Sequence, residues 1–227
     1  MKVEIWSDVV CPLCYIGKRK FEQALSEFDG EVDIIYKSYE LHPHAPKDAQ
    51  ELVVEALAKK FNITVTEAKQ MNGQAVALAA EVGLEYKMDN LRNSNTMDAH
   101  RLTHLAMEKG KMKETVEKLF EAHFTKEKSI HSHSILKEIG LAVGLEAEEL
   151  DDLLGSDRFR DTVEADQAEA SLLGIKGVPF FLFNSKYAVS GAQPKEVFLE
   201  ILHKVKQEEA NKFEITHEGD VCSIDGC

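Results

Sequence analysis

Hydrophobic and polar positions in the first forty residues follow a strand–helix–strand pattern. Residues 2–7 form a short apolar run, and residues 32–41 are rich in β-forming residues, as is typical of strands. Between them, residues 11–28 carry apolar side chains at helical spacing. These side chains belong to Ile16, Phe21, Leu25 and Phe28. The order predicts a β-α-β unit whose strands pair in parallel through a right-handed crossover.

From residue 48 to residue 175 the hydrophobic pattern is helical almost throughout. Apolar residues recur at helical spacing in several stretches, separated by polar or glycine-containing breaks. Sheet character returns over residues 177–184 and 187–191, which predicts a hairpin. A final helix is expected over residues 194–210, with a proline in its first turn.

This order predicts an α/β fold in which a large all-helical insertion separates the β-α-β and β-β-α halves. Residues 1–47 and 176–210 form the α/β domain, and residues 48–175 form the insertion domain. Residues 211–227 form a polar, acidic tail that ends in a Cys-x₄-Cys pair. The sheet must therefore be assembled from segments that lie far apart in the chain.

Composition limits the partners that the protein can bind. The 227 residues carry a formal net charge of −13, which argues against nucleic acid and anionic membranes, since both bind basic surfaces. The longest apolar run, 178–183, is far shorter than the ~18 residues that cross a bilayer. Met1 leads almost directly into the first predicted strand, without the apolar stretch of a secretory leader, so we expect a cytoplasmic protein.

Two of the four cysteines lie where the first strand gives way to the first helix, in the sequence Cys11-Pro12-Leu13-Cys14. Free N–H groups and the helix dipole favour negative charge there, so a thiol at this position ionises more readily. Proline suits the first helical turn because its φ is fixed and it lacks an N–H group. Asp8, just before the dithiol, is a candidate either for proton transfer to Cys14 or for a turn or cap role. The thiolate is the form that attacks disulfides, so the motif predicts a reactive dithiol.

Four segments, taken together, point to a known family. They are residues 7–17, which contain the dithiol; 95–102, Asn-Thr-Met-Asp-Ala-His-Arg-Leu; 174–181, Gly-Ile-Lys-Gly-Val-Pro-Phe-Phe; and 190–193, Ser-Gly-Ala-Gln. The chain resembles the DsbA family, and within it the FrnE-like branch, which is related to 2-hydroxychromene-2-carboxylate isomerases. The resemblance implies a thioredoxin fold with a helical insertion. It covers the chain apart from its tail.

The resemblance also implies roles for individual residues. Cys11 would be the exposed nucleophile and Cys14 the resolving thiol. Pro179 would follow a cis peptide bond and face the dithiol. The backbone of Val178 would then be offered to an extended substrate, which could bind by strand-like hydrogen bonds.

Four further residues are expected to contact substrate. Pro12 and Leu13 separate the two cysteines, and the resemblance suggests that Asn95 and His100 line the groove that faces Cys11. His100 and His104 stand four residues apart on one predicted helix, a spacing that can hold a metal, but no third ligand is evident. We expect these histidines at the surface or in the groove, and no metal site.

The chain departs from its relatives at two positions. Leu13 occupies the place where strongly oxidising members carry histidine, so one partner for the Cys11 thiolate is missing. We therefore expect a less oxidising dithiol. The isomerase relatives use serine where this chain has Cys11, which makes isomerase chemistry less favoured.

The tail pair, Cys222 and Cys227, has two interpretations. Some FrnE-like proteins carry such a pair, so it would serve as an auxiliary redox pair that exchanges with Cys11 and Cys14. Alternatively, it is idle at a chain terminus. All four cysteines could also form a Cys₄ zinc site, but a proline at a helix start is redundant for zinc and useful for a thiolate.

These observations predict a thiol–disulfide oxidoreductase that acts through Cys11 and Cys14. Its partners would be thiol- or disulfide-containing proteins or peptides. It would need no cofactor, with glutathione as an optional co-substrate, and could be a monomer or a homodimer. Two alternatives remain: a glutathione-linked isomerase or kappa-type transferase, and a chaperone-like peptide-binding protein.

Overall fold

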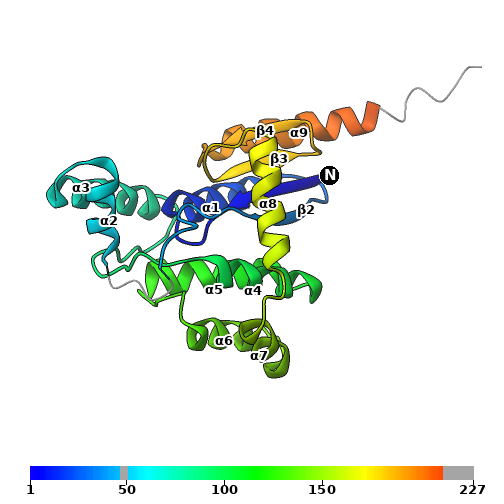
Figure 1. The fold of residues 1–227 in the computed structure, drawn as a ribbon. Helices are drawn as coiled ribbons and strands as arrows, with labels where there is room; N and C mark the ends of the chain where they lie inside the picture. Colours follow the sequence, from blue (N-terminus) through cyan, green and yellow to red (C-terminus); the bar gives the residue numbers. More distant parts are fainter. Residues whose placement is uncertain (47–50, 212–227) are drawn as a thin grey trace, which may run out of the picture.

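The computed structural model describes residues 1–46 and 51–211, where one sheet has four strands in the order β2-β1-β3-β4 (Figure 1). β1 (Lys2–Ser7) pairs in parallel with β2 (Asp33–Ser38) and antiparallel with β3 (Phe180–Phe183). β3 also pairs antiparallel with β4 (Tyr187–Ser190). The predicted parallel pair and C-terminal hairpin are confirmed, and the mixed α/β fold is the one expected.

β2 ends at Ser38 rather than at residue 41, the predicted limit. The N–H of Tyr39 still donates to the carbonyl of Ser7 in β1 at 3.2 Å, but side chains bind the next two backbone N–H groups. Glu40 donates to Oε1 of Gln167 at 3.3 Å, and Leu41 donates to Oδ2 of Asp8 at 2.7 Å. Because these acceptors satisfy the buried backbone as well as a strand would, the chain can leave the sheet early.

Helices cover both faces of the sheet. α1 (Pro12–Glu27) and α9 (Lys195–Asn211) lie on one face and share an aromatic cluster with β3. The cluster consists of Phe21, Phe181, Phe183 and Phe198. α8 (Arg160–Leu172) covers the other face, where the indole of Trp6 donates to the carbonyl of Asp166 at 3.1 Å. Burial on both faces explains why β3 has no alternation of apolar and polar residues.

The described residues between β2 and β3 are mostly helical, as predicted. Besides α8, the elements are α2 (Val53–Phe61), α3 (Val65–Ala80), α4 (Met97–Glu108), α5 (Met112–Phe120), the π-helical turn η1 (Glu121–Thr125), α6 (His133–Ala142) and α7 (Ala147–Gly155). Residues 81–96 form the main non-helical connection. None of the helices in the described ranges has the length and apolar character needed to cross a bilayer.

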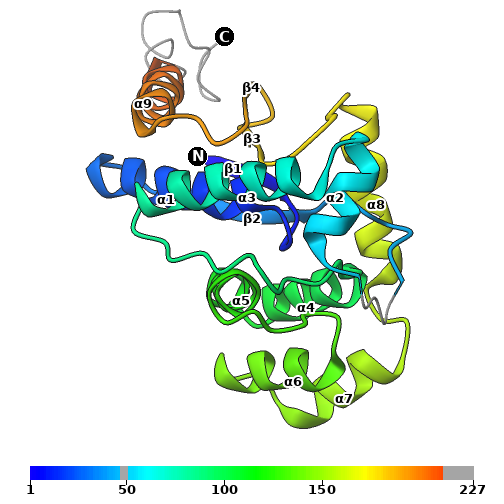
Figure 2. The same ribbon diagram turned by 90° about the vertical axis from the view of Figure 1, so that its left-hand side faces the viewer.

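Apart from α8, the helices between β2 and β3 form two groups in space. Figures 1 and 2 show α4 and α5 below the sheet, with α6 and α7 beyond them. α2 and α3 pack on each other as a separate pair, and α3 contacts α1. The dithiol helix α1 therefore touches both the sheet and the α2–α3 pair.

Candidate functional site

The two cysteines of the Cys-Pro-Leu-Cys motif lie at the start of α1. Cys11 is the N-cap residue, and its N–H donates to the carbonyl of Asp8 at 3.0 Å. The N–H of Cys14 donates to the carbonyl of Cys11, also at 3.0 Å. Both are free thiols. The helix start and its proline are thus confirmed, and the backbone turn fixes both sulfurs on the same short segment.

Cys11 is only 6% exposed, so the expectation of an exposed nucleophile is wrong for this structure. Its Sγ donates to the carbonyl oxygen of Val178 across a distance of 3.7 Å. The peptide bond between Val178 and Pro179 is cis, as the resemblance implied. Residues from the start of the chain and from the segment before β3 therefore meet at one place, where the carbonyl of Val178 lies against the sulfur of Cys11.

Burial separates the second cysteine from solvent even more completely. Cys14 is 2% exposed. Burial, together with the neighbouring Cys11, raises the pKa of the Cys14 thiol well above its usual value, although Ser7 and the backbone of Asp8 act in the opposite direction. Cys14 is therefore a protonated thiol at neutral pH.

Asp8 has a structural role in the turn before the dithiol. It is fully buried; its carbonyl accepts from Cys11, and its carboxylate accepts from the N–H of Leu41. The turn interpretation of Asp8 is thus confirmed, whereas the cap interpretation is wrong, because no side chain caps the start of α1. His100 lies beside it, with Nε2 3.4 Å from Oδ1 of Asp8. A proton transfer from Cys14 to Asp8 stays a prediction.

A cavity of about 480 Å³ begins at the two residues between the cysteines. Pro12 and Leu13 form part of its wall, together with Val10, Leu41, His42 and residues of α2, α3, 88–94 and the π-helical turn η1. Leu13 is 40% exposed, so an apolar side chain beside the dithiol faces open space. The hydroxyl of Tyr86 donates to the carbonyl of Pro12 at 2.7 Å and holds this wall in place.

Asn95 and His100 do not line this cavity. The side chain of Asn95 donates to the carbonyl of Ala45 at 3.2 Å and accepts from the N–H of Met97 at 3.1 Å, so it joins two segments of backbone. His100 is 4% exposed and lies against Asp8. Contact of these two residues with substrate stays a prediction, without support from the cavity wall.

The predicted surface or groove position of His104 is wrong. His104 is 4% exposed, and its Nε2 lies 3.0 Å from Oγ of Ser38 and 3.2 Å from Oδ2 of Asp166. It joins α4 to β2 and α8. Within the residues that the structure describes, no group of three or more histidine, cysteine or acidic side chains is arranged to hold a metal ion. Cys222 and Cys227 lie outside the described residues.

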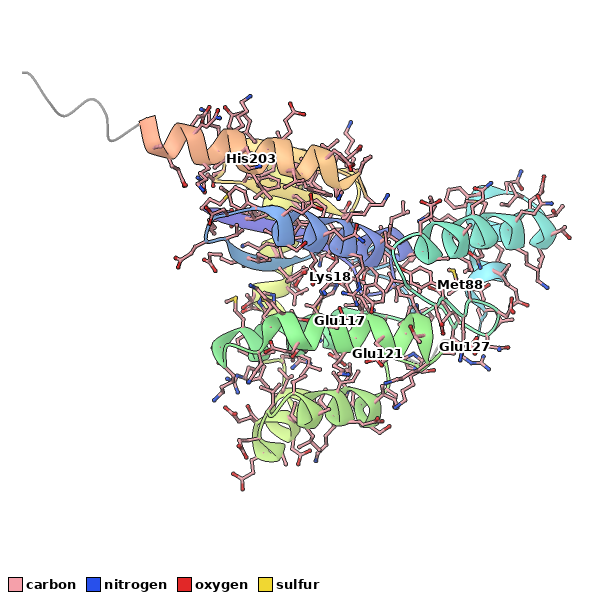
Figure 3. All side chains as sticks on the ribbon, turned by 180° about the vertical axis from the view of Figure 1, so that it is seen from behind. Lys18, Met88, Glu117, Glu121, Glu127 and His203 are labelled. Atoms are coloured by element: carbon pink, nitrogen blue, oxygen red, sulfur yellow. The ribbon has the colours of Figure 1, made fainter. Side chains whose placement is uncertain are left out.

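Sequence reasoning missed a cluster that fixes α1 against α5. Glu117 of α5 accepts from Tyr15 at 2.6 Å, from Lys18 at 2.5 Å and from Arg19. Figure 3 shows Lys18 and Glu117 facing each other between the two helices. Although burial acts against the charged form, these donors lower the pKa of the Glu117 carboxyl to about 2. One carboxylate thus anchors the helix that carries the dithiol.

Comparison with known proteins agrees with this geometry. Residues 2–203 match the family of DSBA-like thioredoxin domains. A crystal structure of a probable DsbA oxidoreductase from Streptomyces coelicolor is 37% identical; the match covers 100% of this chain and 98% of that chain, with a TM-score of 0.87.

Two more distant structures show the fold alone. A 2-hydroxychromene-2-carboxylate isomerase is 13% identical over 93% of this chain and 99% of its own, with a TM-score of 0.72. The cytosolic disulfide reductase DsbM from Pseudomonas aeruginosa, solved with GSH, is 15% identical over 91% of this chain and 100% of its own, with a TM-score of 0.64. Because the family match spans nearly all of the described residues, the chain belongs to the family of DSBA-like thioredoxin domains.

Proposed function

We propose that the protein is a thiol–disulfide oxidoreductase that acts through Cys11 and Cys14. The observation that carries the proposal is the placement of Cys11 at the N-cap of α1, with its Sγ 3.7 Å from the carbonyl of Val178. A helix start favours the thiolate, which is the attacking species in disulfide exchange. The carbonyl beside it offers an acceptor to the backbone of an extended substrate.

The proposed reaction has two steps. The Cys11 thiolate attacks one sulfur of a substrate disulfide, which forms a mixed disulfide and releases the other substrate sulfur as a thiolate. Cys14 then loses its proton and attacks Sγ of Cys11, which forms the Cys11–Cys14 disulfide and releases the second substrate thiolate. Two electrons pass from the dithiol to the substrate.

The burial of Cys14 fits the order of these steps. Burial keeps the Cys14 thiol protonated, so it does not compete with Cys11 for substrate, because thiolates are the nucleophiles. Formation of the mixed disulfide places a sulfur leaving group within its reach. Cys14 is thus suited to the second step.

The direction of the reaction depends on the redox partner. In a reducing compartment the enzyme would work as a reductase, and glutathione would be a suitable thiol to regenerate the dithiol. The reductase DsbM, which shares the fold and was solved with GSH, makes glutathione a reasonable first candidate. The absence of histidine at position 13 favours the same direction.

Trapping of the mixed disulfide tests the proposal. A Cys14→Ser variant, in a background where Cys222 and Cys227 are serine, should accumulate a covalent adduct with a disulfide-containing peptide, and mass spectrometry should place it on Cys11. The matched Cys11→Ser variant should form no adduct. Equal adduct formation in both variants, or none in either, would exclude the proposed reaction.

A further inference from the structure

The cavity beside the dithiol has an apolar wall and a one-sided charge. Its wall includes Leu57, Phe61 and Leu78 from the α2–α3 pair, together with Met88, which Figure 3 shows below α3. About 480 Å³ is within the usual range for small-molecule sites. A space of this size next to Leu13 is large enough for a ligand of its own, separate from the two sulfurs.

The charged residues of this wall are cationic, although the chain as a whole is strongly acidic. The chain has 40 acidic and 27 basic residues, yet the described lining residues include Lys60 and Arg92 and no aspartate or glutamate. Lys60 is exposed and has no ion pair within the described part of the chain; its Nζ lies 5.9 Å from the centre of the Phe61 ring. Burial is the main cause of the lowered pKa of His42, another residue of the wall, and the ammonium of Lys60 lowers this pKa further. The ammonium of Lys60 is therefore the group of this wall that is placed to bind an anion.

A second polar group lies deeper in the wall. His123 belongs to η1, a π-helical turn, and such turns are frequent at functional sites. It is 2% exposed, and its Nδ1 has no hydrogen-bond partner among the residues described. Burial lowers the pKa of His123 to about 4, so the imidazole is neutral at pH 7. An unpaired buried nitrogen costs free energy that a ligand can recover.

We propose that this cavity binds a small organic acid, whose apolar body lies between α2, α3 and the Pro12–Leu13 wall and whose anionic group lies at Lys60. His123 supplies the polar contact inside the cavity. The site uses none of the redox chemistry of the dithiol and so extends the proposed function rather than repeating it. An occupant would touch the two residues that separate the cysteines.

Matched pairs of acids and alcohols test the proposal by calorimetric titration of the full chain. The probes are decanoate and naphthoate, each compared with the alcohol of the same carbon skeleton. The two acids together show whether the cavity prefers an aliphatic or an aromatic ligand. At least one acid should bind at a single site, and the affinity should fall as salt concentration rises. If neither acid binds, the proposal is wrong.

Lysine variants identify the contact with the anion. Lys60→Gln should weaken binding of the acid about two- to fivefold, the usual range for an exposed ion pair, and leave the alcohol unaffected. The control is Lys59→Gln, on the same helix, whose ammonium pairs with Glu51 at 2.5 Å and which does not line the cavity. Equal effects of the two variants, or an equal loss for acid and alcohol in Lys60→Gln, would overturn the assignment.

Two further variants locate the ligand inside the cavity. His123→Phe keeps the ring and removes its nitrogens, so the acid should bind about two- to tenfold more weakly. Leu57→Trp should fill the cavity and abolish binding of both acid and alcohol. Cys11→Ser should bind the acid like the wild type, so a failure of the proposed redox reaction would remain distinguishable from a failure of this site. Unchanged binding in Leu57→Trp, with the fold verified by circular dichroism, would place the ligand elsewhere and overturn the proposal.

Discussion

Gly17 of α1 and Pro179 before β3 are in close contact: a Cβ atom added to Gly17 would lie 3.0 Å from Cγ of Pro179. Such a distance is shorter than an ordinary van der Waals contact between carbon atoms. The glycine therefore allows the segment that carries Val178 to approach the helix that carries the dithiol. Its lack of a side chain helps to set the distance between Cys11 and Val178.

Gly17→Ala should slow disulfide exchange because the new methyl group pushes against Pro179. Gly73→Ala is the matched control, since Gly73 lies in α3 with no atom near the added Cβ. The control should gain about 0.5–1 kcal/mol of stability and keep its exchange rate. Gly17→Ala should lack this gain. Urea unfolding and peptide-disulfide reduction measure both effects, and equal results for the two variants would contradict the contact argument.

Glu117→Gln should lower the free energy of unfolding and make this free energy depend less on pH in the acid range. The folded-state pKa of Glu117, about 2, lies below its ordinary value of 4.5. Its contribution is therefore fully present above pH 4.5 and is lost as pH falls toward 2. The stability of the wild type should drop over this window by up to about 3 kcal/mol more than that of the variant.

Glu114→Gln is the control for this experiment, because Glu114 lies exposed on the same helix α5. It should unfold like the wild type at every pH. Denaturant titrations between pH 2 and pH 7 give the comparison. Parallel curves for wild type and Glu117→Gln would show that the cluster around Lys18 does not anchor α1.

Cys14 should react slowly with alkylating reagents in the folded protein. Burial both covers the sulfur and raises its pKa, so little thiolate is present at pH 7. In a Cys11→Ser variant, iodoacetamide labelling of Cys14, followed by peptide mass spectrometry, should be much faster in urea than in buffer. Labelling at the same rate in both solutions would mean that Cys14 is accessible and not a protected second thiol.

Leu13→His should make the dithiol more oxidising. A histidine at the start of α1 would place a hydrogen-bond donor near the Cys11 thiolate and so stabilise the reduced form. A gain of 1.4 kcal/mol corresponds to about 30 mV for this two-electron couple. Equilibration in glutathione buffers measures the potential, and Leu13→Gln separates the effect of the imidazole from the loss of the leucine. A potential unchanged in Leu13→His would remove the physical basis for expecting a weak oxidant.

Local sequence patterns predicted the elements whose causes are local. The dithiol at a helix start follows from Pro12, and the hairpin turn falls where Asn184 and Ser185 adopt positive φ. The end of β2 could not be predicted, because the acceptor for Glu40 is Gln167, which lies far away in the chain. The residues next to Glu40 in the sequence do not indicate that Gln167 will bind its N–H group.

The site was predictable only in part for the same reason. The reactive dithiol was evident from four consecutive residues, whereas the carbonyl that contacts Cys11 belongs to Val178, far away in the chain. The cavity exists because α2 and α3 leave space beside Leu13. Helical periodicity predicts each of these helices but not the space between them. His123 gave no signal in the sequence, since a single histidine has no pattern.

Leu13 lies both beside the dithiol and in the wall of the cavity, so this one position links the reduction potential of the dithiol to the ligand preference of the cavity. A substitution there alters the neighbourhood of the thiolate and, in the same step, reshapes the cavity wall. A mutation selected for a new reduction potential would therefore carry a change in ligand preference with it. To change one of these two properties alone, a mutation must fall on a residue that faces only one site, such as Leu57, which lines the cavity.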